Sequence, residues 1–391
     1  MPERGRGLTR RPCIAHLTHA LGQGGVERGI VQLATRLPAE RFRQIVISLA
    51  EPSDLAEEIG AHRVFRLGKR PGNDLRLVLR LARLLRRERV DLLHARGWAT
   101  LVEGRLAAWL APGCKMIYGY HGKTFEDLAQ PRRRRLIAQR LLLPRMQALV
   151  AVSPTAAREW LGEVGLAVQV ELIPDGIPAP PPVRPETRAA LRRELGVPAG
   201  SICVGSVGRL DPVKDQATLL RAVASLWASG LDAVCVLVGD GPERPALQRL
   251  AGELGGRERV RFLGTRRDVP RLLAAFDLFV QASLSEALPN ALLEGLGAGL
   301  PAVATAVGGT LDVVRPEVGV LVPPGDPAAM ALAVLRLARD PDLRRRLGAA
   351  GRALVARRYS LDAMLAAYAD LYARLLPPPA PAWAGAVRRA G

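Results

Sequence analysis

The sequence is poor in aromatic residues and contains no long apolar stretch. Phe, Trp and Tyr make up only 4% of the 391 residues, and no aromatic platform of the kind that binds single-stranded nucleic acid is visible. No run approaches the roughly 18 apolar residues that a membrane-spanning helix needs. The polar, basic segment 1–11 is not followed by the apolar region of a signal peptide. We therefore expect a cytoplasmic protein that does not bind nucleic acid.

Cysteine is scarce as well. The four residues Cys13, Cys114, Cys203 and Cys235 are far apart and form neither a CxxC motif nor a zinc-ligand pattern. Cys203 and Cys235 lie within apolar runs, where a thiol packs as a small hydrophobic group. We expect no disulfide framework, no metal site and no bound cofactor.

Acidic residues are outnumbered, with 37 Asp and Glu against 56 Lys and Arg and a formal net charge of +19. This excess fits an anionic membrane, nucleic acid or phosphorylated substrates, or only a GC-rich genome. Two amphipathic segments concentrate it: Leu75–Arg89, and residues 132–146, where four consecutive arginines precede leucines. In the first, one helical face carries Arg76, Arg80, Arg83 and Arg87. Such segments are typical of a peripheral membrane protein at an anionic surface, or of core helices with a solvated basic face.

Short apolar runs alternate with longer helical patterns along the chain, which predicts two α/β domains with doubly wound, largely parallel sheets. Residues 174–185 contain six prolines, too many for a helix or a central strand. We therefore divide the chain into a domain of residues 1–178, a linker region 179–195 and a domain of residues 196–360. Helices are expected over residues 328–359 and 361–376. Two such sheets cannot share one core, so they should face each other across a cleft.

The predicted strands are apolar runs of four to six residues. They lie at Ile14–Leu17, Gln44–Leu49, Arg63–Leu67, Val90–His94, Lys115–Gly119 and Ala148–Val152 in the first half, and at Ser201–Gly205, Ala233–Val238, Val260–Leu263, Leu278–Gln281, Pro301–Thr305 and Gly319–Val322 in the second.

A glycine-rich loop, Gly22–Gly25, follows the first predicted strand. Glycines allow close backbone approach, and the helix that begins near Val26 would point its free N–H groups into the cleft. The loop therefore suits a phosphate or a sugar ring, or it is an ordinary strand–helix turn. It matches neither a Walker A loop nor a dinucleotide fingerprint.

Two basic residues follow the first strand of the second domain. Arg209 and Lys214 lie at its carboxyl end, and the Asp211-Pro212 turn can bring them together. A guanidinium fork beside an ammonium group suits a diphosphate, although a solvated charged turn would look the same.

Glu286 and Glu294 lie eight residues apart, with a helix expected to begin at Pro289. Eight helical residues span ~12 Å, which is too far for the paired carboxylates of a hydrolase. We interpret them as two contacts along one elongated ligand, although Glu294 alone could be an exposed helix residue. The helix N-terminus at Leu288, Pro289 and Asn290 adds N–H groups that could bind phosphate.

Together these motifs resemble the retaining glycosyltransferases of family 4, which have the GT-B fold. The resemblance covers most of the chain and rests on the order of six motifs. They are Gly22–Gly25, His121-Gly122, Ile173-Pro174-Asp175-Gly176-Ile177, Gly208-Arg209-Leu210 with Lys214, Val238-Gly239-Asp240-Gly241-Pro242, and the pair Glu286 and Glu294. Asp175 departs from the family, which more often has Asn there. The Gly68–Gly72 segment looks like that of exopolysaccharide sugar transferases.

The resemblance implies a hexosyltransferase that moves a sugar from a nucleotide-diphosphate donor to a hydroxyl of a glycan or polyprenyl-linked acceptor. The first domain would bind the acceptor, the second would bind the donor, and helix 361–376 would cross back onto the first. Retention would occur by front-face displacement without a metal.

The resemblance also implies roles for the site residues. Arg209 and Lys214 would hold the diphosphate, Glu286 the donor sugar and Glu294 the ribose hydroxyls. Gly24 and Gly25 would approach the donor from the opposite domain, Gly241 and the Leu288–Asn290 segment would line its phosphate side, and His121 would lie near the reacting sugar.

Two other functions remain open from the sequence. A non-catalytic GT-B-like basic protein at the membrane would not need the retained Arg209, Lys214, Glu286 and Glu294. A sugar-nucleotide epimerase of the GT-B fold would need further acidic catalysts in the cleft. A nicotinamide-dependent enzyme is a poor fit, because Glu51 is badly placed for the ribose contact.

Overall fold

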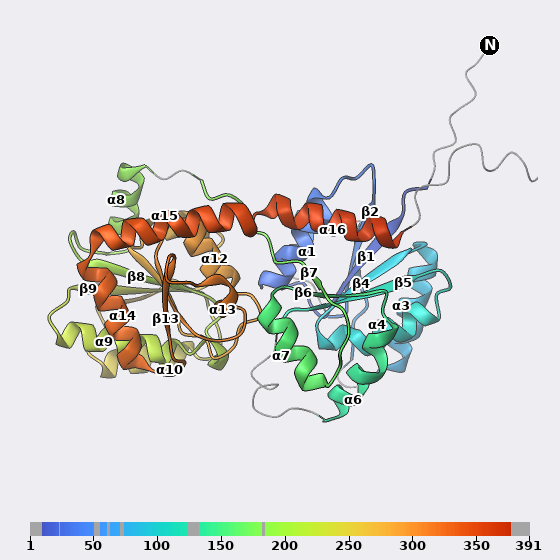
Figure 1. Ribbon diagram of the computed structural model, residues 1–391, viewed down its shortest axis with the longest axis horizontal. Coiled ribbons are helices and arrows are strands. Elements are labelled where there is room, and N and C mark those ends of the chain that lie inside the picture. The colour runs from blue at the N-terminus through green and yellow to red at the C-terminus, as the bar shows by residue number, and fades with distance from the viewer. Residues whose placement is uncertain are drawn as a thin grey trace, which may run out of the picture.

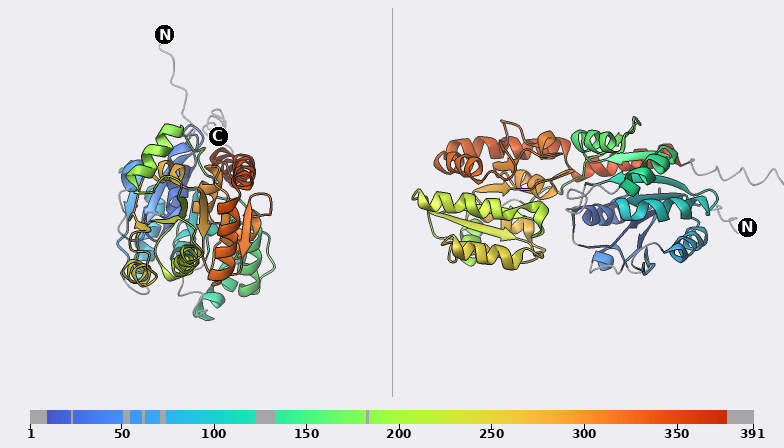
Figure 2. Two further views of the ribbon diagram at one scale, coloured as in Figure 1. Left: turned by 90° about the vertical axis from the view of Figure 1, so that its left-hand side faces the viewer. Right: turned by 90° about the horizontal axis from the view of Figure 1, so that it is seen from below.

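The computed structural model describes residues 10–22, 24–50, 55–60, 63–70, 74–122, 133–181 and 184–376. They form two α/β domains that lie side by side along the long axis of the molecule (Figure 1). Seen along that axis, helices lie on both sides of the sheets (Figure 2). The predicted fold class, two doubly wound domains of the GT-B type, is confirmed.

The first domain contains a seven-stranded parallel sheet in the order β3-β2-β1-β4-β5-β6-β7. Its strands are β1 (Cys13–Thr18), β2 (Arg43–Ser48), β3 (Val64–Arg66), β4 (Leu92–Arg96), β5 (Lys115–Tyr120), β6 (Ala148–Ala151) and β7 (Glu171–Leu172). The central strands β1 and β4 are buried throughout and mostly apolar, as in sheets covered by crossover helices, although they also bury His16, His94 and Arg96. The strand order reverses between β1 and β4, and ligands bind at such switch points.

The helices of the first domain are α1 (Gly25–Arg36), α2 (Leu55–Ile59), α3 (Leu75–Arg87), α4 (Trp98–Trp109), α6 (Arg133–Leu142) and α7 (Pro154–Val164). On α3 the predicted basic face is exposed, while Leu77, Leu81 and Leu85 are buried. Asp74 caps this helix by accepting a hydrogen bond from the Leu77 N–H at 3.1 Å.

The second domain contains a six-stranded parallel sheet in the order β10-β9-β8-β11-β12-β13. Its strands are β8 (Ile202–Val207), β9 (Ala233–Val238), β10 (Val260–Phe262), β11 (Leu278–Gln281), β12 (Ala302–Thr305) and β13 (Gly319–Val322). Its helices are α8 (Pro185–Glu194), α9 (Gln216–Ala228), α10 (Arg244–Glu253), α11 (Val269–Leu272), α12 (Asn290–Gly297), α13 (Thr310–Val313), α14 (Pro327–Arg339) and α15 (Pro341–Arg358). The order reverses between β8 and β11, the strands that precede the predicted donor-binding loops.

The prediction of a single helix over residues 328–359 is wrong, because the helical conformation is interrupted at Asp340, between α14 and α15. Asp340 leaves the helical conformation and caps α15 by accepting from the Leu343 N–H at 2.8 Å. Pro341 follows, and its missing N–H suits the first turn of a new helix.

Helix α16 (Leu361–Leu375) crosses back to the first domain, as predicted. Ile177 pairs with Ser360 in an isolated bridge where the two crossing segments meet. Beyond it, Met364, Tyr368 and Tyr372 pack against the sheet of the first domain. Helices α15 and α16 therefore run across both domains (Figure 1).

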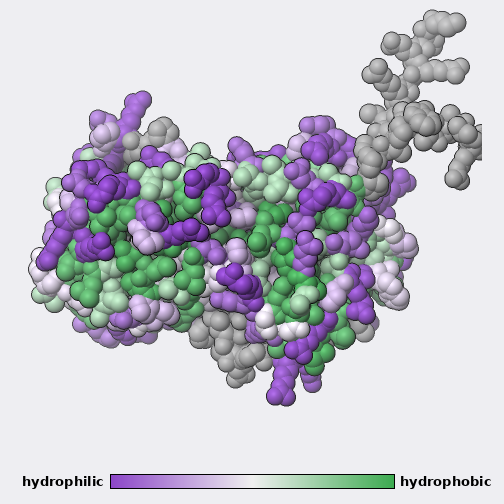
Figure 3. Space-filling model, in the orientation of Figure 1, coloured by the Kyte–Doolittle hydropathy of each residue, from purple (hydrophilic) through white to green (hydrophobic). Residues whose placement is uncertain are grey.

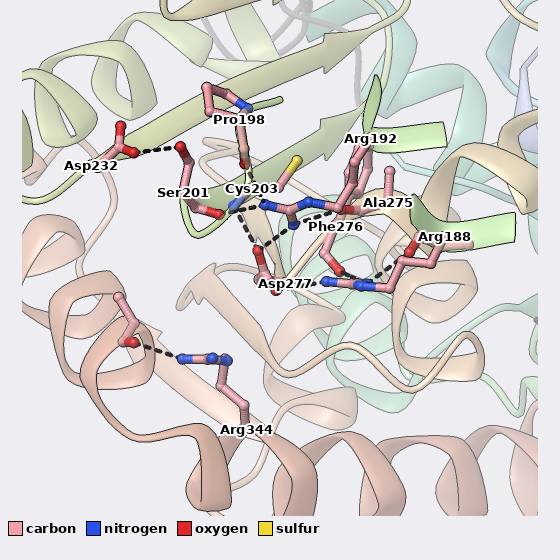
Figure 4. Close-up of polar contacts among 12 residues, drawn as sticks. Arg188, Arg192, Pro198, Ser201, Cys203, Asp232, Ala275, Phe276, Asp277 and Arg344 are labelled. Carbon is pink, nitrogen blue, oxygen red and sulfur yellow. Dashed lines mark hydrogen bonds and ion pairs between the residues drawn. The ribbon is translucent and has the colours of Figure 1, made fainter. Parts of the chain in front are cut away.

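The linker predicted over residues 179–195 is also wrong in part, because α8 fills most of it and packs on the second domain. Leu191 is buried in that domain's core. Arg188 and Arg192 both contact Asp277, at 2.7 and 2.9 Å, and Asp277 also accepts from the Cys203 N–H (Figure 4). Proline density identified residues 174–181, which lie outside any helix or strand, but not the arginines that fix α8.

None of the helices described is both long enough and apolar enough to cross a bilayer.

We predict that Asp277→Asn lowers the free energy of unfolding by about 2–3 kcal/mol, because two guanidinium groups lose their shared carboxylate. Urea denaturation measures it. The matched control is Asp342→Asn on α15, where an exposed pair with Arg345 should contribute little. If Asp277→Asn were as stable as the unsubstituted protein, the contacts of Asp277 with Arg188 and Arg192 would not stabilise the position of α8.

Candidate functional site

The two domains meet at the carboxyl ends of their strands, around Asn290 at the start of α12. Its Nδ2 donates to the Asp175 carboxylate of the first domain at 2.9 Å. A β-carbon on Gly25 would lie 2.4 Å from the same Nδ2, so a larger residue there would displace the Asn290 side chain from Asp175. Nearby, a β-carbon on Gly122 would lie 3.1 Å from that of Ala287. Gly25 in the glycine-rich loop and Gly122 after β5 therefore face the segment that follows β11 in the second domain.

The glycine-rich loop leads directly into α1. Gly24 is the helix N-cap and has no side chain of its own to cap the first turn, but the Glu27 carboxylate accepts from the backbone N–H groups of Gly24 and of Glu27 itself. Glu27, in that turn, has its pKa raised by burial, while Arg209 of the other domain and Arg96 oppose the shift. The structure therefore places Gly25 against Asn290 of the second domain, and the contact of Gly24 and Gly25 with a donor stays a prediction. Gln23 lies outside the described residues.

The basic loop after β8 has the predicted tight turn. Asp211 caps a short 3-10 helix, Pro212–Lys214, and its carboxylate also accepts from Arg209 Nε at 2.6 Å. The Arg209 side chain remains 72% exposed. A β-carbon on Gly241 would lie 2.2 Å from the Leu210 carbonyl oxygen, so this glycine lets the loop after β9 pack tightly against the basic loop.

Lys214 and Glu286 form the central ion pair of the second domain. Lys214 Nζ lies 2.6 Å from Glu286 Oε1, which also accepts from the Ser283 hydroxyl at 2.7 Å. The Glu286 side chain is 9% exposed. The Gly309 N–H donates to the Glu286 carbonyl and fixes its backbone. A bound diphosphate would compete with Glu286 for the ammonium group and leave the carboxylate available to sugar hydroxyls.

Helix α12 begins one residue later than predicted, with Pro289 as its N-cap. Leu288 and Pro289 are buried, and Asn290 faces the first domain. Glu294 lies within the helix, and burial raises the pKa of its carboxyl group, while Arg28 of α1 opposes the shift. The alternative interpretation of Glu294 as an exposed helix residue is therefore wrong.

His121 follows β5, and neither of its ring nitrogens has a hydrogen-bond partner among the residues that the structure describes. Burial, together with Arg96, lowers the pKa of His121 to about 3. The imidazole is therefore neutral near pH 7, and it can donate from one nitrogen and accept at the other but carries no acidic proton to supply.

The sequence did not indicate the contribution of four charged residues. Arg96 ends β4 as a buried cation, and Glu27, Asp175 and Asp312 are acids at the domain boundary. Asp312 accepts from the N–H and hydroxyl of Thr155 across that boundary, both at 2.9 Å. The sequence could not show these contributions, because each depends on an interaction between segments far apart in the chain. One signal was available: Arg96 places a charge at the end of an apolar run, which marks a polar group at the end of a buried strand.

Two family models together account for both domains. The model described as Glycosyltransferase Family 4 matches residues 23–179, and the model described as Glycosyl transferases group 1 matches residues 187–354. The chain belongs to the family 4 glycosyltransferases. The predicted family is thus confirmed, and the GT-B fold with it.

Relatives and solved structures agree with this placement of the family 4 chain. It is 38% identical over 233 residues to the lipopolysaccharide core biosynthesis glycosyltransferase LpsD of Rhizobium meliloti, covering 59% of this chain and 64% of that protein. It is 27% identical to the Escherichia coli UDP-Gal:alpha-D-GlcNAc-diphosphoundecaprenol alpha-1,3-galactosyltransferase, covering 84% of this chain and 88% of that protein. The structure of Anabaena Alr3699/HepE in complex with UDP-glucose aligns with a TM-score of 0.82 at 24% identity, covering 93% of this chain and 99% of that one.

The match to the first curated relatives is partial. The aligned region spans 64%, 53% and 63% of the lengths of three of them.

We predict that the His121 ring does not titrate between about pH 5 and 8 in the folded protein. Its folded pKa of about 3 lies below the unfolded value of about 6.5, so protonation favours unfolding and the stability it contributes is lost as pH falls below about 6.5. NMR of ring ¹⁵N signals measures it, with the urea-unfolded chain as control. A folded-state midpoint between about 6 and 7 would contradict the buried, neutral state.

Proposed function

We propose that the chain is a retaining hexosyltransferase that moves a sugar from a nucleotide-diphosphate donor to a hydroxyl of a glycan or lipid-linked acceptor. Its biological setting would be bacterial exopolysaccharide or cell-envelope glycan synthesis. The observation that carries the proposal is the Lys214–Glu286 pair at the carboxyl end of the second sheet, 2.6 Å apart. It lies on the same edge of the sheet as Arg209 and the start of α12.

The leaving diphosphate is where negative charge develops in this reaction. Lys214, Arg209 and the amides at the start of α12 are fixed donors for that charge, which lowers the barrier directly. The acceptor oxygen forms a bond to the anomeric carbon on the face from which the diphosphate oxygen departs, and the acceptor proton passes to that oxygen. Glu286 holds hydroxyls of the donor sugar, and Glu294 holds those of the ribose.

The roles of the two domains follow from this placement. Residues 196–360 bind the donor, and residues 1–178 together with α16 bind the acceptor. His121, neutral and partnerless, offers the reacting sugar a hydrogen bond rather than a charge. Gly24 and Gly25 close over the donor from the first domain.

The relatives support the substrate class. The Escherichia coli relative is named for UDP-Gal and a diphosphoundecaprenol acceptor, LpsD for lipopolysaccharide core biosynthesis, and HepE was crystallised with UDP-glucose. A non-catalytic basic protein would not need Lys214 and Glu286 in contact. An epimerase would need acids beside the donor sugar, and the additional buried acid Asp175 is already engaged by Asn290.

We predict that Lys214→Met and Glu286→Gln each lower kcat for donor hydrolysis or transfer by roughly 10²–10³-fold, because each removes a charge or contact at the developing diphosphate or the sugar. Rates with UDP-, GDP- and ADP-sugars are measured in EDTA, and ¹H NMR of the first product gives its anomeric configuration. Arg336→Met, which removes an exposed cation on α14, is the control. Full activity of Lys214→Met, or an inverted product, would contradict the proposal.

We also propose that the enzyme lies on an anionic membrane surface through one corner of the first domain. The α4–α6 patch consists of the exposed apolar residues Trp109, Ile137 and Leu141, with Arg133 and Arg134 beside them. Helices α4 and α6 are in contact, and hydrophilic and hydrophobic residues lie next to each other at this corner (Figure 3). Apolar side chains next to arginines suit an interface with anionic headgroups.

We predict that Ile137→Glu with Leu141→Glu weakens binding to vesicles containing anionic phospholipid, because two charges replace inserted apolar side chains. Co-sedimentation measures it, with neutral vesicles in parallel. Leu332→Glu, which changes an even more exposed leucine on α14 of the other domain, should bind as the unsubstituted protein does. If the double variant binds these vesicles as well as the unsubstituted protein does, the α4–α6 patch is not the membrane contact.

A further inference from the structure

Three basic or imidazole side chains converge at the carboxyl ends of β4 and β5. A β-carbon on Gly119 would lie 3.0 Å from His121 Nε2, 3.3 Å from His94 Nε2 and 3.5 Å from Arg96 Cγ. We call these three residues the Arg96 cluster. His94 is fully buried, its Nδ1 bonds to the Tyr372 hydroxyl at 2.8 Å, and its Nε2 has no partner within the described part of the chain. Both nitrogens of His121 also lack a partner in the described ranges, which end at Gly122 on this side and resume at Arg133.

A chain of hydrogen bonds holds Arg96 in place. Gln44 Nε2 donates to the Leu33 carbonyl at 2.8 Å, which turns the amide oxygen of Gln44 toward His16 Nε2, also at 2.8 Å. His16 must therefore carry its proton on Nε2, so its Nδ1 accepts from Arg96 Nη1 at 3.1 Å. The Tyr368 ring of α16 lies 6.0 Å from the guanidinium carbon. Arg96 is thus oriented by both the first sheet and α16.

The positive charge of Arg96 is not matched by a contacting carboxylate. Its exposed fraction is 4%, yet no ion pair to it occurs within the described parts of the chain. Asp175 and Glu27 interact with it only through longer-range electrostatics, and Asp175 is already bonded to Asn290. The hydrogen-bond partners of Arg96 are the neutral side chains of His16, Tyr368 and Tyr372. A buried guanidinium that has only neutral partners is costly unless an anion completes its shell.

The Arg96 cluster adjoins the proposed reaction centre. His121 precedes Gly122, and Gly122 faces Ala287, the residue after Glu286. The cluster therefore lies across the cleft from Glu286, on the side of the domain that we assign to the acceptor.

We propose that the Arg96 cluster binds an anionic group, a phosphate or a carboxylate, carried by the acceptor close to its reacting hydroxyl. This inference rests on the proposed function. The guanidinium supplies charge and several N–H donors, and the partnerless nitrogens of His94 and His121 supply further hydrogen bonds to oxygen atoms. A neutral sugar would leave the buried charge uncompensated. The donor diphosphate already has Lys214 and Arg209 in the other domain.

The test is a titration of the full-length protein with inorganic phosphate, in the presence of saturating UDP so that Lys214 and Arg209 are occupied. The chain has five histidines, so selective ¹⁵N-histidine labelling gives few ring signals. We expect saturable shifts of the His94 and His121 signals. In Arg96→Gln the phosphate affinity falls at least about tenfold, while Arg336→Gln, with the same loss of charge on α14, titrates as the unsubstituted protein does.

Two outcomes overturn the anion site: no saturable shift, or an equal affinity in Arg96→Gln and the unsubstituted protein. Thermal unfolding checks that the variant is folded, and Arg96→Lys, which keeps the charge but loses the fork, gives an intermediate affinity if Arg96→Gln is not folded. If Arg96→Lys then binds phosphate as tightly as the unsubstituted protein does, the Arg96 cluster is not the anion site.

A second measurement assigns the anion to the acceptor. Donor hydrolysis is compared for UDP-glucuronate and UDP-glucose, and we expect the ratio of the two rates to be the same in Arg96→Gln as in the unsubstituted protein. A selective loss with UDP-glucuronate would place the anion on the donor sugar and overturn the acceptor assignment. Absence of hydrolysis with every donor, alongside intact phosphate binding, would instead count against the proposed function alone.

Discussion

The contact of Asn290 with Asp175 and Gly25 is the point on which the arrangement of the site depends. It joins the start of α12 in the second domain to two parts of the first domain: its last residues, at Asp175, and the start of α1, at Gly25. Because both sheets are parallel, the strand ends that carry polar loops then face each other. Helix α16 stabilises this geometry by packing the end of the chain onto the first sheet.

Charge is distributed across this cleft in two separate centres. Lys214 and Arg209 lie in the second domain with carboxylate partners that a diphosphate can replace. Arg96 lies buried in the first domain without such a partner, and together with burial it keeps His16 and His121 neutral by lowering the pKa of each to about 3. The same cation therefore sets the protonation of His121 and makes this side of the cleft attractive to anions.

The sequence predicted what local patterns determine. Apolar runs placed every strand of both sheets except the two-residue β7, and motif order placed the loops that carry Gly25, Lys214 and Glu286. It failed at α8, because proline density does not report the contacts of Arg188 and Arg192 with Asp277. It also missed Arg96, whose role depends on residues of β1, β2 and α16 that only the folded chain brings together. The break between α14 and α15 did have a local signal, the Asp340-Pro341 pair, because Asp340 caps the new helix and Pro341 suits its first turn.

The central claim is that the second domain recognises a diphosphate through Lys214 and Arg209. Calorimetric titration with nucleoside diphosphates and the matching monophosphates, for uridine, guanosine and adenosine, tests it most directly. For the preferred base we expect the diphosphate to bind at least about tenfold more tightly than the monophosphate, and this preference to disappear in Lys214→Met. Equal affinities, or a preference that survives the substitution, would contradict the account.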